Sequence, residues 1–295
     1  MAEPRRVENL QTDRGKIPVY ATGTVDQPWD GYTAEEHETW RQLFARQRAL
    51  LPGRACQAFL EAQAAMGMSP DRIPRFDDLN EALAGTTGFR IVGVEGLLPE
   101  LDFFDHLAHR RFPVTWWIRR PDQIDYIEEP DLFHDLFGHV PLLMNPVFAD
   151  YLQAFGRGGV KAHALGPDAL MCLARLYWYT VEFGLIREQG GLRIYGSGIV
   201  SSSGESVYSV ESAAPNRIGF DLERVMRTRY RIDTFQKTYF VIDSFEQLMR
   251  ATEPDFTPIY ARLAELEAYP AGTVLDSDRV LQRGTREGWA TDGDV

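Results

Sequence analysis

The chain has 295 residues, and with 44% apolar and 25% charged side chains it can bury a sizeable core under a polar surface. Its 31 lysines and arginines face 43 aspartates and glutamates, and the net charge of −12 argues against nucleic acid or anionic lipid as a partner. The polar start MAEPRRVENL and the lack of a long apolar stretch argue against a signal peptide and a membrane span, so we expect a cytoplasmic protein.

Residues 1–31 mix proline, glycine and charge without periodicity, which predicts an irregular N-terminal arm. Thr33 and Glu36 form a capping box, so we expect an amphipathic helix from there to about Leu51. Short strands then alternate with helices. The expected helices run to about Met66, over 76–84 and from Pro99 to about His109, and the expected strands cover 89–94 and 113–118.

Helices dominate the second half of the chain. We expect them from Asn145 to about Phe155, from Pro167 to about Arg187, over about 221–229 and over about 244–251, with strands over 191–195 and in YFVID. Residues 272–295 are polar and rich in turns, which predicts a peripheral C-terminal tail. The expected fold is one domain over residues 32–271, mainly α-helical with minor short β-strands.

Two of the six histidines, His134 and His139, lie in the apolar segment PDLFHDLFGHVPLL, which indicates burial. On a regular α-helix a step of five residues turns by about 500°, so the two imidazoles would point about 140° apart. Gly138 and Pro141 predict that the helix ends between the histidines, and a turn there would let His139 swing back toward His134.

Glu182 is the only charged residue between Arg175 and Arg187, and its neighbours are large and apolar. A carboxylate in such a place must be protonated, paired with an arginine or bound to a cation, because burying the charge alone costs on the order of several kcal/mol. Two imidazoles and one carboxylate would suit a ferrous ion with open coordination positions. Pairing of Glu182 with either arginine and simple hydrogen bonding of the histidines stay open as alternatives.

His106 and His109 form a competing pair, since they lie three residues apart on a predicted helix with Asp102 one turn earlier. Their polar, arginine-rich surroundings favour a solvated helix end, because cationic side chains near a helix C-terminus suit its dipole. We therefore do not expect this pair to hold a metal.

Three motifs in this order, PDLFHDLFGHVPLL, LYWYTVEFGLI and IYGSGIVSSSGES, resemble the pterin-dependent aromatic amino acid hydroxylases, most closely the bacterial single-domain phenylalanine hydroxylases. The segments RRFPVTWWIR and YRIDTFQKTYFVIDSF match as well. The resemblance implies that residues 32–271 are a catalytic domain and that His134, His139 and Glu182 hold Fe(II). The implied reaction is the hydroxylation of L-phenylalanine to L-tyrosine with a tetrahydropterin and O2.

The same resemblance assigns substrate contacts. Arg119 falls at the family's clamp for the amino acid carboxylate, a role that suits a planar guanidinium with two parallel donors. Pro130 and Trp178 are expected to line the pocket for the aromatic ring, and Ser201 is expected near the backbone atoms of the substrate.

Pterin contacts are also implied by the resemblance. Phe103 matches the ring on which the pterin stacks, and Gly96 and Leu98 match the backbone edge that hydrogen-bonds the pterin heteroatoms. Asp135 stands where animal members carry glutamate, so this shorter carboxylate is expected to reach the pterin through water.

Three alternatives remain: the same chemistry on tyrosine or tryptophan, a zinc hydrolase on the same ligands, and a metal-buffering protein. The hydrolase is disfavoured because no general base accompanies the triad as glutamate does in H-E-x-x-H. Animal members carry a regulatory domain and a C-terminal tetramerisation helix, and the chain shows neither. We therefore expect a constitutively active monomer, functionally coupled to an enzyme that recycles the pterin.

Overall fold

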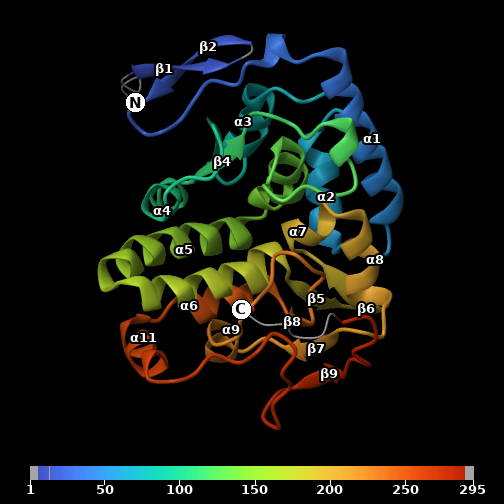
Figure 1. Cartoon of the computed structure of the whole chain (residues 1–295), viewed down its shortest axis with the longest axis vertical. Helices are drawn as coiled ribbons and strands as arrows, with labels where there is room; N and C mark the ends of the chain where they lie inside the picture. Colours follow the sequence, from blue (N-terminus) through green and yellow to red (C-terminus); the bar gives the residue numbers. More distant parts are fainter. Residues whose placement is uncertain (1–5, 13, 290–295) are drawn as a thin grey trace.

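The computed structural model describes residues 6–12 and 14–289, so the outermost residues of the predicted arm and tail, 1–5 and 290–295, lie outside it. Most of the regular structure is helical and the strands are short, which confirms the predicted fold class. A hairpin lies at one end of the long axis and a mixed sheet at the other, with helices between them (Figure 1). Within the described residues, no helix has both the length and the apolar character that crossing a bilayer requires.

The first long helix, α1 (Ala34–Leu50), begins where the sequence predicts. Thr33 caps it, because its hydroxyl accepts from the Glu36 N–H at 3.2 Å while the Glu36 carboxylate accepts from the Thr33 N–H at 2.8 Å. The buried face of α1 carries Trp40 and Leu43 into the main core. The helices that follow are α2 (Gln57–Met66), α3 (Phe76–Ala84) and α4 (Glu100–Ala108).

The prediction of an irregular N-terminal arm is wrong, because the arm contains a hairpin of β1 (Arg6–Thr12) and β2 (Gly15–Tyr20). The 3₁₀ turn η1 (Trp29–Gly31) then leads into α1, and a parallel pair is formed by β3 (Arg90–Val94) and β4 (Arg111–Thr115). Val25 pairs with both Val19 and Gly93 and so joins the arm to β3. Local periodicity cannot indicate such a long-range contact.

Two helices, α5 (Pro146–Leu165) and α6 (Pro167–Tyr177), lie side by side in the middle of the molecule (Figure 1). The sequence predicts that the first ends near Phe155, but it continues to Leu165. A Cβ at Gly159 would lie 2.1 Å from the ring of Phe104 on α4, so this glycine permits close helix packing rather than ending the helix.

A mixed sheet with the strand order β6-β5-β8-β7-β9 closes the far end of the molecule. Its strands are β5 (Leu185–Glu188), β6 (Gly191–Ile194), β7 (Asn216–Gly219), β8 (Thr238–Ile242) and β9 (Val280–Gln282). The helices of this half are α7 (Ser197–Val200), α8 (Ser203–Glu211), α9 (Leu222–Met226), α10 (Phe245–Thr252) and α11 (Thr257–Ala264). Because β9 lies within the predicted C-terminal tail, part of that tail joins the sheet. The boundary between the catalytic domain and the tail at residue 272 stays a prediction.

Candidate metal centre and its surroundings

Both candidate histidines lie on η3 (His134–His139), a turn of π-helix. The predicted helix end between them is wrong, because the chain stays helical and continues into the 3₁₀ helix η4 (Pro141–Met144). A π-helix bonds residue i to residue i+5, so five residues complete about one turn and the second ring returns above the first. Gly138 serves packing instead, since a Cβ there would lie 2.9 Å from the Ser197 carbonyl oxygen.

The third candidate ligand also lies on a π-turn. The predicted helix from Pro167 to Arg187 is shorter than expected, because α6 gives way to the π-helix η5 (Trp178–Glu182) and then to β5. The Phe183 N–H donates to the Trp178 carbonyl at 2.8 Å, which is the i to i+5 bond of this geometry. Glu182 therefore projects from the end of a wide turn that faces η3.

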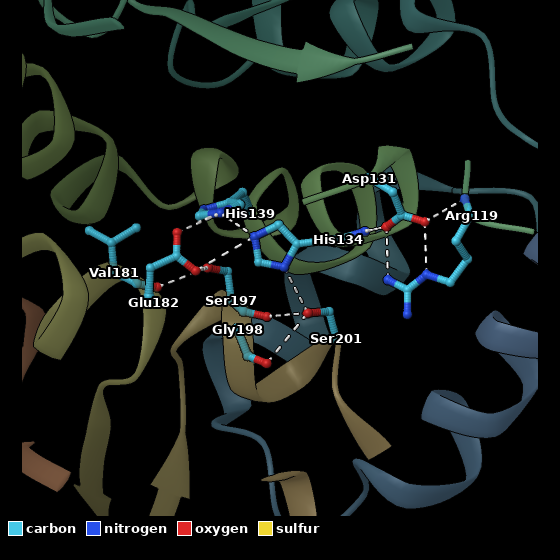
Figure 2. Close-up of polar contacts among 9 residues, drawn as sticks. All are labelled: Arg119, Asp131, His134, His139, Val181, Glu182, Ser197, Gly198 and Ser201. Carbon is cyan, nitrogen blue, oxygen red and sulfur yellow. Dashed lines mark hydrogen bonds and ion pairs between the residues drawn. The ribbon is translucent and has the colours of Figure 1, made fainter. Parts of the chain in front are cut away.

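The three side chains point toward one another (Figure 2). The Nε2 atoms of His134 and His139 are 3.1 Å apart. Glu182 Oε1 lies 3.1 Å from His139 Nε2, and Glu182 Oε2 lies 3.6 Å from His134 Nε2. With metal–ligand bonds of about 2.1 Å, neighbouring ligands of an octahedral ion are about 3.0 Å apart. The geometry therefore fits three ligands on one face of such an ion.

The alternative ion pairs for Glu182 are not formed. Arg175 Nη1 donates to the Met226 carbonyl at 3.1 Å, and Arg187 pairs with Asp243 at 2.5 Å. The carboxylate thus lies beside two imidazoles, with neither arginine as its partner, as expected of a ligand to a cation.

The competing histidines do not gather a third ligand. Among the residues that the structure describes, His134, His139 and Glu182 form the group whose candidate ligand atoms all lie within 4.8 Å of one another. His106 is buried, with 2% of its surface exposed, so the prediction of a solvated helix end is wrong for this residue. His109 is exposed as predicted, and its Nδ1 lies 2.8 Å from the Asp105 carbonyl within the same helix.

Hydrogen bonds determine which ring nitrogen of His134 carries the proton. Ser201 Oγ donates to the Ser197 carbonyl at 2.8 Å, so it accepts from His134 Nδ1 at 3.0 Å and leaves Nε2 with its lone pair. Burial lowers the pKa of His134 to about 4. Burial alone would raise the pKa of Glu182, but the His139 ring and the Ser197 hydroxyl lower it. Neutral nitrogen and anionic oxygen are the donor set that ferrous iron takes in a facial triad.

A cavity of about 280 Å³ opens beside the triad. Its lining includes Pro130, one of the two predicted ring-pocket residues, and the predicted pterin residues Gly96, Leu98, Phe103 and Asp135. Its lining also includes Phe112, Thr115 and Tyr177, which the sequence did not single out. The side of the triad that faces this cavity is where further ligands could approach.

Asp135 is buried beneath the cavity. One of its oxygens accepts from the Thr115 N–H on β4 at 2.7 Å, which fixes the direction of the carboxyl group. Burial raises the pKa of Asp135 to about 7 despite the nearby His139.

Arg119 and Asp131 form a buried ion pair (Figure 2). Nε and Nη2 of Arg119 each donate to a different oxygen of Asp131 at 2.8 Å. Asp131 also accepts from the His134 N–H at 3.0 Å, as a helix N-cap does, and so links the arginine to the metal-facing turn. The sequence prediction missed Asp131, although its position three residues before His134 is a capping signal. Arg119 lines a second cavity, of about 380 Å³, rather than the one beside the triad.

Trp178 also lies outside the lining of the first cavity. Its Nε1 donates to Gln236 Oε1 at 2.9 Å, and its ring stacks on Tyr230 with centroids 4.3 Å apart and planes 16° apart. The sequence did not indicate either partner, because both follow the triad by about fifty residues and meet Trp178 only in the fold. Ser201, which is expected near the substrate, lies with its Oγ 3.0 Å from His134 Nδ1.

Residues 20–267 match the family described as biopterin-dependent aromatic amino acid hydroxylases. The chain belongs to this family.

Two curated relatives of high similarity, both called phenylalanine-4-hydroxylase, come from bacteria. The protein of Ralstonia nicotianae is 65% identical over 92% of this chain and 86% of its own length. The protein of Chromobacterium violaceum is 62% identical over 92% of this chain and 91% of its own length. A solved structure of the latter with bound oxidised Fe(III) matches with a TM-score of 0.86 and 61% identity, covering 88% of this chain and 94% of that one.

Proposed function

We propose that the protein hydroxylates L-phenylalanine to L-tyrosine, with Fe(II) and a tetrahydropterin as cofactors and O2 as co-substrate. The observation that carries the proposal is the convergence of His134, His139 and Glu182 beside the cavity that contains the predicted pterin residues. The names of the relatives support the choice of phenylalanine.

The triad would hold the iron through two ring nitrogens and one carboxylate, leaving the opposite face for oxygen and substrate. When bound, iron and pterin together supply the redox chemistry that activates oxygen. The protein's part is to keep the ligand atoms in the right protonation state. Ser201 holds the Nδ1 proton of His134, and Ser197 lies 2.9 Å from Glu182 Oε2.

The substrate side of the proposal assigns the amino acid carboxylate to Arg119. Asp131 occupies Nε and Nη2, so the guanidinium is held rigidly before the substrate arrives. Pro130 and Trp178 would bound the aromatic ring, and Trp178 is held at both its nitrogen and its face. Ser201 is proposed to lie near the backbone atoms of the substrate, where its hydroxyl also accepts from His134 Nδ1.

The pterin side of the proposal assigns ring stacking to Phe103 and hydrogen bonding to the backbone of Gly96 and Leu98. All three line the same cavity as the triad. Asp135 lines it too and would act on the pterin through water, because its carboxylate is shorter than a glutamate's.

The decisive experiment is to incubate iron-loaded protein with a tetrahydropterin, O2 and equal amounts of phenylalanine, tyrosine and tryptophan, and to identify the products. Tyrosine formed from labelled phenylalanine is expected. If hydroxylated tyrosine or hydroxylated tryptophan is the main product, the preferred substrate is that amino acid and not phenylalanine. Fully iron-loaded protein without oxygen uptake would refute the proposal and favour a zinc hydrolase or a metal-buffering protein, which metal analysis separates.

We further propose a monomer in the cytoplasm, supplied with reduced pterin by a separate recycling enzyme, with residues 32–271 as the catalytic domain. Cys56 and Cys172 are both free and buried, which agrees with a reducing compartment. Light scattering at several protein concentrations tests the monomer, and a constant mass near 33.5 kDa is expected.

A further inference from the structure

We call residues 17–25, which are the end of β2 and the segment that follows it, the strap. The strap packs against β3, whose last residue, Val94, lines the cavity that the proposed function assigns to the pterin. Ile17 and Val25 of the strap are buried with Trp116 in a small cluster of their own, separate from the main core. The Val25 N–H donates to the Gly93 carbonyl at 2.8 Å, so the strap adds to the exposed edge of β3.

A glycine of β3 lets the strap approach closely, and a second glycine forms a turn within the strap. A Cβ at Gly93 would lie 2.5 Å from the Val25 carbonyl oxygen. Any larger residue at this position would therefore push Val25 and the strap away from β3. Gly23 has a positive φ of 74°, and a Cβ there would lie 3.9 Å from Leu98 Cδ2. β3 leads directly into the backbone of Gly96 and Leu98, so the strap borders the edge assigned to the pterin.

His106 fastens the strap to α4. Its Nδ1 accepts from Arg111 Nε at 2.9 Å, so the ring proton is on Nε2, which donates to the Thr22 carbonyl at 3.1 Å. The ring is 2% exposed and has no other role in the site described above. The same helix carries Phe103, the proposed stacking ring, less than one turn earlier.

We propose that His106 is a positioning residue that fastens the strap across α4 and β3, and so holds Phe103 and the Gly96–Leu98 edge in place for a pterin. This inference rests on the proposed function. The strap contacts lie on the pterin side of the site, whereas Arg119 and Trp178 are held by Asp131 and Gln236. Releasing the strap should therefore weaken pterin binding without weakening phenylalanine binding.

The test compares His106→Ala with two matched variants of the full chain. His106→Gln keeps one donor and one acceptor, and His109→Ala removes an exposed histidine of the same helix end. Hydrogen–deuterium exchange reports on residues 17–25, and calorimetry with 7,8-dihydrobiopterin reports pterin affinity of the iron-loaded protein without turnover. The KM values for tetrahydropterin and phenylalanine complete the comparison.

For His106→Ala we expect faster exchange in the strap and pterin affinity weakened by about three- to tenfold, which corresponds to the loss of one or two buried hydrogen bonds. The KM for phenylalanine and the iron content should not change. His106→Gln should restore most of the affinity, and His109→Ala should match the wild type. If His106→Ala does not fold, Gly93→Ala should release the strap by displacing Val25, with the same loss of pterin affinity.

A loosened strap with unchanged pterin affinity would overturn the inference, as would an equal loss of phenylalanine and pterin binding or a wild type that binds no dihydrobiopterin. A wild type that binds the pterin but forms no tyrosine would instead refute the proposed function. The two failures are distinguishable because exchange and calorimetry need no turnover.

Discussion

Replacing Asp131 with asparagine tests how the buried arginine is held. The side chain of Asp131 is 0% exposed and that of Arg119 is 6% exposed, so the substitution leaves a guanidinium in the interior without its counter-charge. Breaking such a pair by removing one partner costs about 3 to 5 kcal/mol. A domain is stable by about 5 to 15 kcal/mol, so Asp131→Asn should fold but should unfold at a much lower urea concentration.

The matched control is Asp122→Asn, which removes the same type of partner from the adjacent Arg120. That pair is exposed, with side-chain accessibilities of 71% and 69%, so the urea midpoint should not change. Asp131→Asn should also raise the KM for phenylalanine, because Arg119 loses the partner that orients it. Equal urea midpoints for the two variants would refute the reasoning that burial makes the difference.

The pH dependence gives a second check on Asp131. Burial alone would raise the pKa of Asp131, but the bonds and charge of Arg119 hold it below its usual value. A carboxyl with a lowered folded-state pKa adds stability above its unfolded pKa of about 3.9 and loses it as the pH falls. The stability difference between wild type and Asp131→Asn should therefore be constant above about pH 5 and shrink below about pH 4.

Glu182→Ala should remove the bound iron while leaving the fold, and one iron per chain by metal analysis would contradict the ligand assignment. Ser201→Ala removes the acceptor for His134 Nδ1 and should weaken iron affinity by about 10- to 100-fold in a chelator competition. An unchanged iron affinity would contradict this role of Ser201. Arg119→Lys should raise the KM for phenylalanine, because an ammonium group replaces a planar guanidinium with two parallel donors. An unchanged KM would mean that another residue binds the carboxylate of the substrate. Burial raises the pKa of Glu205 to about 7, so its carboxyl lowers the stability of the wild type as the pH rises from about 4.5 to 7. Glu205→Gln should therefore lose less stability than the wild type between pH 5 and pH 8 in urea unfolding, while the slope that Asp135 contributes should remain.

Elements with a local signal could be predicted from the sequence. The capping box at Thr33 and the prolines that open helices fixed where α1, α5 and α6 begin. Errors arose where distant contacts decide the structure. α5 continues past Phe155 because Gly159 packs against Phe104, and the arm forms strands because Val25 pairs with Gly93. Neither partner is visible in a window of neighbouring residues.

The candidate site shows the same division. His134, His139 and Glu182 could be nominated because their residue types are costly to bury. The sequence predicted that the two histidines converge, but by a helix end at Gly138, whereas the structure brings them together on a π-turn. His106 was expected in solvent because its neighbours in sequence are polar. Thr22, which covers it, lies 84 residues away along the chain.

The π-turn under His134 and His139 bears on how metal ligands are sought in other chains. Two ligands three or four residues apart share one face of an α-helix, as in H-E-x-x-H. Two ligands five residues apart do not, but one extra residue in the turn restores the shared face. An interval of five in an apolar segment, with glycine just before the second ligand, is therefore a pattern worth including in such searches.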